Sequence, residues 1–438
     1  MKKTAALIAL VMLLTCTFGL ANAETTLRLV GPGFRSEETI VDPVSGVATL
    51  GYDYLVKKYQ EYCGTVLQIE AAPWDNWTAK LSSTATGGLA DVLVHGATMV
   101  DVVYDLTEKI NGEPELLDTL FISGSYRRKD INDYTHLFTT GVPVGLNVYT
   151  ICYDKQIFDD FGVEYPNATD TWDTFLAKLK AITGTNPVTG GECYGSTINM
   201  SATNLWRPFA AYNWANDIHV TELADYKWDS KQFYDSEEVI GTFRFLQELA
   251  TTFAPGWAEK VGFEGFGTNE NNVGVYLDVM PLSLYNLTVA NDCVDRYGYC
   301  PYPANQDGVV CCFLGDWNMA IPVTTQDEAG AWNFIKWLGT DVDAAKYILA
   351  TNNLPNSKAA IAGMAEEGYP FAEAVAASLE KYPQNFWLSS SVYYDNLFGN
   401  VESIFANNIT PLYAQEITPE ECAKGIQEEL EILADSMR

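Results

Sequence analysis

The sequence predicts a two-lobed α/β protein in which each lobe holds a mainly parallel sheet flanked by helices. The chain has 438 residues, which exceeds the roughly 100 to 200 residues of an ordinary domain. Hydrophobic residues make up 47% and charged residues 19%, a balance that supplies enough apolar material for buried cores. Strands and helices alternate along the chain, which is typical of sheets covered by helices on both faces.

The first lobe is expected to begin with repeated units of strand, loop and helix. The expected elements are strands over 26–30, 65–71 and 90–94 and helices over 52–62 and 76–86, assigned from period-2 and helical spacing of apolar residues. In sheets of this kind, ligands bind beyond the carboxyl ends of the strands. These ends are 31–36 and 95–99, so we expect both segments to reach a ligand site.

The rest of the chain predicts further strands and helices and a helical carboxyl-terminal region. A strand-like run is expected over 142–153, strands over 273–277, 309–314 and 319–323, and helices over 155–161, 172–182, 204–214, 237–252 and 328–338, with 341–438 mostly helical. We find no internal repeat and no low-complexity tract.

The charge of the chain argues against nucleic acid as a partner. Its 26 Lys and Arg residues face 57 Asp and Glu residues, which gives a formal net charge of -31. Such a chain repels phosphate backbones, and its one basic cluster is Arg127, Arg128 and Lys129.

The amino-terminal segment predicts export. Lys2 and Lys3 precede an apolar run over 5–14, and Ala21-Asn22-Ala23 ends a signal peptide that we expect over 1–23. No later stretch has the roughly 18 apolar residues of a transmembrane helix, so we expect a protein of the periplasm or the extracellular space. An alternative is a lipid anchor on Cys16, although Thr15 is a poor fit before a lipidated cysteine.

The cysteines predict disulfides, because an exported chain meets an oxidising compartment. Of the nine cysteines, eight lie beyond Cys16, and none forms a Cys-x-x-Cys pair. The favoured disulfide joins Cys293 to Cys300. Buried free thiols are the alternative, most plainly for Cys152 inside an apolar strand pattern.

Five local patterns occur in an order that resembles one known family. They are Trp77 to Val92 with Ala90-Asp91-Val92, Gly141-Val142-Pro143 followed by Ile151 to Lys155 and Phe158, Thr171 to Phe175, Gly315 to Pro322 followed by Ala331 to Leu338, and Asn353-Leu354-Pro355. Together they resemble the maltose-binding-protein-like group of extracellular solute-binding proteins, which carry sugars for ABC importers. Asp154 replaces the usual Asn of the second pattern, and eight cysteines are unusual for the group.

The resemblance implies a periplasmic-binding-protein-like fold of type II, in which two lobes close on a ligand by hinge motion. It implies a signal peptide over 1–23, an amino-terminal lobe of 24–145 plus 315–353 and a carboxyl-terminal lobe of 146–314 plus 354–438. The chain would cross between the lobes near 142–150, 314 and 354. The implied partners are a sugar or oligosaccharide and the permease subunits of an ABC transporter. We expect a monomer that catalyses no reaction.

A sugar site needs aromatic planes for C–H faces and polar side chains for hydroxyls. The chain has 11 Trp, 25 Tyr and 20 Phe residues, and the Trp residues at helical spacing, Trp172, Trp332 and Trp337, are expected in the core. Ligand-binding candidates follow strand ends or lie beside turns: Arg35, Ser36, Glu37, His95, Thr98, Trp206, Trp214, Asp278, Asp316, Trp317 and Trp387. For each polar candidate, a solvated loop residue or helix cap is the alternative interpretation. Replacing Trp317, or to a lesser degree Trp206, by Ala is expected to weaken sugar binding without unfolding the protein.

Other function classes have less support in the sequence. The turn Gly31-Pro32-Gly33 lacks the third glycine of a dinucleotide-binding loop, so no cofactor is expected. A secreted hydrolase would need a catalytic constellation, and neither Gly-x-Ser-x-Gly nor His-Glu-x-x-His occurs. A glycosidase with a carboxylate pair remains an alternative, as does the same fold binding a metal ion or a polyamine.

Overall fold

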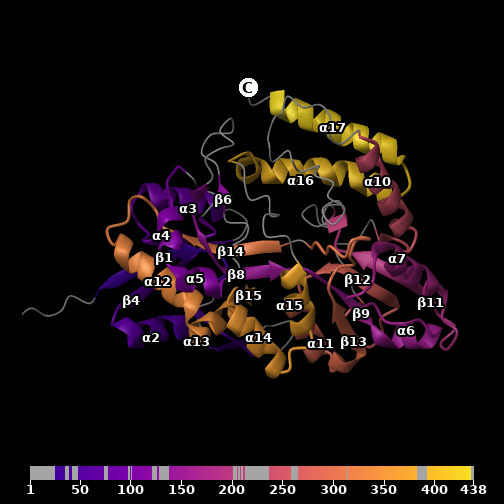
Figure 1. Ribbon diagram of the computed structural model, residues 1–438, viewed down its shortest axis with the longest axis horizontal. Coiled ribbons are helices and arrows are strands. Elements are labelled where there is room, and N and C mark those ends of the chain that lie inside the picture. Colours follow the sequence, from indigo (N-terminus) through magenta and orange to yellow (C-terminus); the bar gives the residue numbers. More distant parts are fainter. Residues whose placement is uncertain are drawn as a thin grey trace, which may run out of the picture.

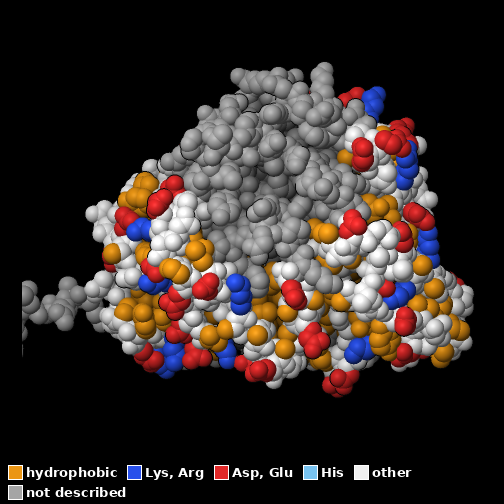
Figure 2. Space-filling view, viewed as in Figure 1, with side chains coloured by type: hydrophobic (Ala, Val, Ile, Leu, Met, Phe, Trp, Pro, Cys, Tyr) orange, Lys and Arg blue, Asp and Glu red, His pale blue; other side chains and the backbone are white. Residues whose placement is uncertain are grey.

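The computed structural model describes residues 25–34, 39–41, 48–73, 77–96, 99, 101–120, 126–127, 138–200, 205, 208, 211–212, 236–257, 265–312, 314–381 and 392–435. Two main sheets stand at the centres of two lobes that lie side by side in Figure 1. Helices cover both sheets, so the prediction of a two-lobed α/β fold is confirmed. On the face shown in Figure 2, acidic and basic side chains are interspersed over both lobes.

The first sheet has six strands in the order β15-β8-β14-β5-β1-β4. Strand β1 pairs in parallel with β4 and β5, whereas β14 runs antiparallel to both β5 and β8. The strands are β1 (Thr26–Gly31), β4 (Val66–Ala71), β5 (Val92–Val94), β8 (Val142–Val148), β14 (Leu314–Ala320) and β15 (Leu354–Pro355).

Alternating side chains bury the first sheet on both faces. Leu27 and Leu29 point into one hydrophobic cluster, and Val30 points into another on the opposite face. Strand β5 repeats the pattern, because Val92 and Val94 join the first cluster and Leu93 the second. Successive side chains of a strand leave opposite faces, so this segregation requires apolar helices on both sides.

The helices around the first sheet follow the sequence pattern closely. Helix α2 ends at Gly64, whose φ of 78° is a left-handed conformation that glycine adopts without strain. The helices are α2 (Tyr52–Cys63), α3 (Trp77–Thr86), α4 (Thr107–Asn111), α5 (Pro114–Thr119), α12 (Glu328–Thr340), α13 (Val342–Ala345), the 3-10 helix η6 (Lys346–Thr351) and α14 (Lys358–Glu366). The predicted core positions Trp332 and Trp337 are buried on α12, as expected.

The second sheet has five strands in the order β10-β11-β12-β9-β13. Strands β11 and β12 are parallel, and β9 runs antiparallel to its neighbours β12 and β13. The strands are β9 (Thr150–Asp154), β10 (Gly184–Thr185), β11 (Glu192–Ile198), β12 (Val273–Val279) and β13 (Tyr297–Cys300). Both sheets are therefore mixed rather than mainly parallel. The first sheet is mixed because β14, which follows β13 of the second sheet in sequence, inserts antiparallel to its neighbours.

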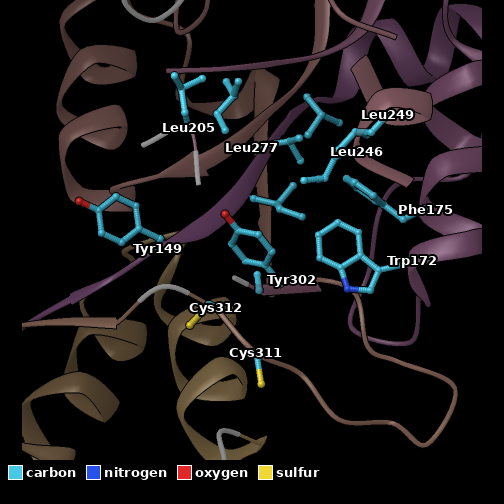
Figure 3. Packing of buried hydrophobic residues seen from close by; sticks show 14 of the residues in the cluster. Tyr149, Trp172, Phe175, Leu205, Leu246, Leu249, Leu277, Tyr302, Cys311 and Cys312 are labelled. Atoms are coloured by element: carbon cyan, nitrogen blue, oxygen red, sulfur yellow. The ribbon is translucent and has the colours of Figure 1, made fainter. Parts of the chain in front are cut away.

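Helices and a tightly packed aromatic core surround the second sheet. The ring of Trp172 packs edge-on against Phe175 and lies 6.0 Å from the ring of Tyr302. Figure 3 shows these side chains together in the core. The helices are α6 (Lys155–Phe161), α7 (Trp172–Ala181), α10 (Glu237–Ala250), α11 (Pro281–Ala290), the 3-10 helix η5 (Val294–Arg296), α15 (Ala372–Lys381), α16 (Val392–Tyr413) and α17 (Pro419–Asp435). Helices α10, α16 and α17 contact one another in a layer at the top of Figure 1.

Two short hairpins complete the described strands. Strands β2 (Thr39–Val41) and β3 (Ala48–Leu50) pair antiparallel, and so do β6 (Tyr126–Arg127) and β7 (Phe138–Thr139).

The chain passes between the two sheets at three places. Strand β8 belongs to the first sheet and β9 to the second, with Tyr149 between them. The second passage lies between Cys300 and Leu314, and the third follows Pro355 of β15 and reaches α15, which contacts β9 and β13. Each lobe is thus built from separate stretches of the sequence.

One strand prediction needs correction. Instead of strands over 309–314 and 319–323, a single strand covers Leu314–Ala320. The side chain of Asn305 accepts hydrogen bonds from the backbone N–H groups of Asp307 and Val309, and this local turn keeps the preceding segment out of the sheet.

The predicted disulfide between Cys293 and Cys300 is also wrong. All eight described cysteines are free thiols, and seven of them are buried. Cys293 packs in the cluster of Phe266 and Tyr297, whereas Cys300 packs in the main cluster of the second lobe, so the two thiols have different buried neighbours. The Sγ atom of Cys293 lies 3.1 Å from the carbonyl oxygen of Gly267.

Candidate functional site

A cavity of about 510 Å³ lies where the two lobes meet. Its volume falls within the range of small-molecule sites, about 300 to 1,000 Å³. Both sheets and the passages between them contribute to its walls. The lining residues are Gly33, Phe34, Ala72, Asn147, Met280, Thr351, Asn352 and Asn353.

The first lobe reaches the cavity from the carboxyl ends of two parallel strands. Gly33 and Phe34 follow β1, and Ala72 follows β4. Gly33 has a φ of 86°, a conformation that suits glycine and turns the chain so that Phe34 comes next to the cavity. The segment after the first strand is one of the two that the sequence predicts at the site.

Phe34 gives the cavity its aromatic surface and packs against two other aromatic rings. Its ring lies 5.8 Å from that of Trp317 in an edge-on arrangement and stacks on Tyr347 at 6.4 Å. Aromatic pairs at these distances fix ring orientation. Phe34 is therefore a firm apolar plane of the kind that packs against the C–H face of a sugar.

Asn147 is the polar residue that the first passage between the lobes brings to the cavity. It lies on β8, where its neighbours Leu146 and Val148 are buried, and it pairs with Gly315 of β14. Its Oδ1 atom is buried and has no hydrogen-bond partner among the described residues. A buried acceptor without a partner costs free energy, so a ligand that donates to it gains affinity.

Thr351, Asn352 and Asn353 line the cavity at the end of η6, just before β15. The amide nitrogen of Asn353 donates to the backbone oxygen of Thr351 at 3.0 Å and to its hydroxyl at 2.8 Å. Asn352 has a φ of 62°, and its amide nitrogen donates to the hydroxyl of Ser283 on α11 at 2.7 Å. This bond connects the segment before β15 to the second lobe beside the cavity.

The second lobe adds Met280, which precedes α11. Two residues earlier, Asp278 has a φ of 58° and accepts a hydrogen bond from the hydroxyl of Tyr302 at 3.0 Å. Asp278 is only 3% exposed, so it supports the end of β12 from within rather than lining the cavity.

The structure describes four of the predicted ligand-binding residues at least in part. His95 follows β5, and its ring lies 5.7 Å from Trp77 and 6.4 Å from Trp317. Asp316 lies on β14 opposite Leu146. The other predicted residues, Arg35, Ser36, Glu37, Thr98, Trp206, Trp214 and Trp387, lie outside the described residues.

Trp317 requires a correction, because it is a core residue. Its side chain is fully buried in the hydrophobic cluster of the first lobe. Its position on the central strand β14 explains this burial, whereas the flanking Gly315, Asp316 and Asn318 suggest a turn in the sequence. Trp317 supports Phe34 from the interior and does not line the cavity.

Sequence reasoning missed the polar residues between the lobes. Asn147 is the one polar side chain in the run Val142–Val148, which is a signal that the strand passes a polar site. Asn352 and Asn353 come directly before Leu354-Pro355. Polar residues are common at such a position, so nothing in the sequence marks them as part of a site. Only the fold brings these residues to β1 and β4.

Among the residues that the structure describes, those that line the cavity carry no ionisable side chain. Within the described part of the chain, no group of three or more His, Cys, Asp or Glu side chains is arranged to hold a metal ion. Nor does any helix there have the length and apolar character needed to cross a membrane.

A protein-family comparison decides what kind of molecule this is. A model for bacterial extracellular solute-binding proteins matches residues 46–345. The chain belongs to this family. It is therefore a solute-binding protein rather than an enzyme, as the sequence predicts. No sequence among the curated proteins matches it.

Solved structures of solute-binding proteins have the same fold. A solute-binding protein of an ABC transporter from Agrobacterium radiobacter K84, in complex with ribitol, has 17% sequence identity and a TM-score of 0.63, covering 93% of this chain and 98% of that one. A sugar transporter from Rhizobium etli in an open conformation has 15% identity and a TM-score of 0.67, covering 93% and 99%. Maltose-bound MalE3 from T. maritima has 17% identity and a TM-score of 0.61, covering 93% and 100%.

Proposed function

We propose that this solute-binding protein captures a sugar or oligosaccharide between its lobes and delivers it to the permease of an ABC importer. The observation that carries the proposal is the cavity at the meeting of the lobes, which combines the Phe34 ring with amide side chains. Rings pack against the C–H faces of sugars, and amides pair with hydroxyls. The solved structures with ribitol and with maltose support the same ligand class.

The three passages of the chain between the sheets act as the hinge. In this proposal the hinge runs through Tyr149, through 301–313 and through the segment after Pro355, so each lobe moves with its own sheet. Closing the lobes excludes water while the ligand's hydroxyls find partners, which is what holds a polar ligand tightly. A permease then distinguishes the closed, loaded form from the open, empty form.

Export and the wider site belong to the same proposal. Residues 1–23 act as a signal peptide, and the mature receptor works as a monomer. Arg35, Ser36 and Glu37 follow Phe34 in sequence and extend the site from the first lobe.

The test is a binding assay that also looks for turnover. Protein lacking residues 1–23 is screened by thermal shift against mono- and oligosaccharides, since a ligand that binds only the folded state raises the melting temperature. Hits are measured by calorimetry, and the incubated sugar is analysed by chromatography. We expect saturable binding with the sugar unchanged. Hydrolysed sugar, or no binding across the panel, contradicts the proposal.

A further inference from the structure

Building on the proposed function, we infer that Ser283 is a positioning residue, which holds the side chain of Asn352 in place for the ligand without lining the cavity itself. The amide nitrogen of Asn352 donates to the hydroxyl oxygen of Ser283 at 2.7 Å. Asn352 lines the cavity, whereas Ser283 is not among the residues that line it. The bond therefore joins a residue that can touch the ligand to one that supports it.

The backbone of Asn352 is fixed by its place at the end of η6. Its N–H donates to the carbonyl oxygen of Leu349 at 3.1 Å, and its φ of 62° is a left-handed conformation that Asn adopts more readily than most residues. The neighbouring Thr351 and Asn353 are bonded to each other. The side chain of Asn352 is what remains to be ordered, and the bond to Ser283 orders it.

Ser283 is held firmly because it lies in the first turn of α11. Pro281 begins this helix, and Leu282 and Leu284, on either side of Ser283, are 5% and 4% exposed. Leu284 packs in a hydrophobic cluster of the second lobe. A side chain on a packed helix positions its partner more precisely than one on a loop does. The bond thus anchors Asn352, which precedes β15 of the first sheet, to the second lobe beside the cavity.

The Asn352 amide keeps polar atoms with which it can recognise a hydroxyl group. A primary amide has two N–H donors and one acceptor oxygen, and Ser283 takes one of the donors. The second N–H and the Oδ1 atom remain for a ligand. A sugar hydroxyl both donates and accepts, so it can pair with either of them. Because the Asn352 side chain is ordered beforehand, less conformational entropy is lost when the sugar binds, and this raises affinity.

Calorimetry on variants of Ser283 tests the inference, with glucose, maltose and ribitol as the probes. Ser283→Ala removes the hydroxyl and keeps a good helix former, and it should weaken the tightest of these probes by about 2- to 12-fold, the range for ordering one side chain. Ser283→Thr keeps a hydroxyl and should bind like the unaltered protein. A loss of affinity as large in Ser283→Thr as in Ser283→Ala contradicts the role of the hydroxyl.

A double-mutant cycle separates action through Asn352 from any other effect of Ser283. Asn352→Ala should weaken the same probe more than Ser283→Ala does, because it also removes the contact with the sugar. Adding Ser283→Ala to Asn352→Ala should then cause no further loss of affinity. If Ser283→Ala has its full effect even in the absence of the Asn352 side chain, the inference is overturned.

A control makes the same substitution away from the cavity. Ser83 on α3 is exposed, and its hydroxyl donates to the carbonyl oxygen of Lys80 on the same helix at 2.9 Å. Ser83→Ala should leave sugar affinity unchanged. Affinity in Ser283→Ala equal to that of the unaltered protein overturns the inference and leaves the solute-binding proposal standing. Absence of binding by every probe to the unaltered protein contradicts both.

Discussion

Trp317 shows how a buried aromatic residue can determine the shape of a site that it does not line. Its ring lies 5.8 Å from that of Phe34, which lines the cavity, and 6.4 Å from that of His95. Because Phe34 is held by this ring, the apolar plane in the cavity depends on the core behind it. Because Trp317 is a core residue, replacing it by Ala is now expected to destabilise the fold, and no longer to weaken binding alone.

Trp317→Ala should lower the free energy of unfolding by about 3 to 5 kcal/mol, the cost of removing a large buried side chain. The measurement is chemical denaturation followed by circular dichroism. Tyr62→Ala is the control, since Tyr62 is an aromatic residue with 62% of its surface exposed and should cost much less. A Trp317→Ala protein as stable as the Tyr62 variant would contradict the core assignment.

Asp154 stands where the family pattern has Asn, and the structure gives a reason for this difference. Its side chain accepts from the backbone N–H of Gln156 at the start of α6. It also accepts from Asn271 and forms an ion pair with Arg296 at 2.7 Å while being fully buried. An Asn would cap the helix equally well but would remove the anionic partner of Arg296, which would keep only backbone oxygens of Asn269 and Asn271 as acceptors.

At the scale of elements, the ion pair of Arg28 and Asp91 ties three segments of the first lobe together. Arg28 on β1 donates to the carboxylate of Asp91 before β5 and to the backbone oxygen of Gly88 after α3. The hydroxyl of Thr325, after β14, donates to the same carboxylate at 2.7 Å. Burial opposes ionisation of Asp91, but these hydrogen bonds outweigh it and lower the pKa of the carboxyl below its ordinary 3.8.

Asp91→Asn should destabilise the protein in a pH-dependent way. Because the folded-state pKa is lowered, the ionised carboxylate stabilises the fold above its ordinary pKa, and that stability is lost as the pH falls through the folded-state pKa. We expect a loss of about 1 to 3 kcal/mol near pH 7 that shrinks under acidic conditions. Denaturation curves from pH 7 down to pH 3 measure it.

The exposed pair of Lys424 and Glu428 supplies the control for that experiment. Glu428→Gln should change stability by less than about 1 kcal/mol, as surface ion pairs do. If Asp91→Asn behaves like the control at every pH, the role assigned to its carboxylate is wrong.

Sequence patterns predicted elements well where local chemistry determines them. Helix α7 begins where Thr171 and Thr174 exchange hydrogen bonds in a capping box, and α6 ends at Gly162 in a left-handed conformation. The sequence patterns gave wrong strand bounds around β14. This strand lies in the middle of the sheet, so its bounds depend on pairing with β5 and β8, which come from distant parts of the chain.

At the scale of the whole molecule, the proposed hinge predicts a measurable change of shape. Binding of a sugar should reduce the radius of gyration of the protein in small-angle X-ray scattering, because the lobes close around the ligand. The ligand-free protein and a non-binding sugar are the controls. An unchanged scattering profile at saturating ligand would show that binding does not close the lobes.

The sequence predicts part of the cavity. The rest could not be predicted for a physical reason. The segment after β1 was expected at the site because the carboxyl ends of parallel strands share one edge of a sheet. Asn147 and Asn353 were not, since they are more than 200 residues apart and meet only through the way the chain passes between lobes. No local pattern encodes such a meeting.

The place of β14 in the first sheet has a consequence for how the protein is made. Residues 314–320 pair with β5 on one side and β8 on the other, so the two parts of this sheet stay unjoined until most of the polypeptide has been synthesised. The nascent chain therefore lacks the centre of its first core for most of translation. Together with the export proposed above, this order predicts that the chain crosses the membrane before its first sheet is complete.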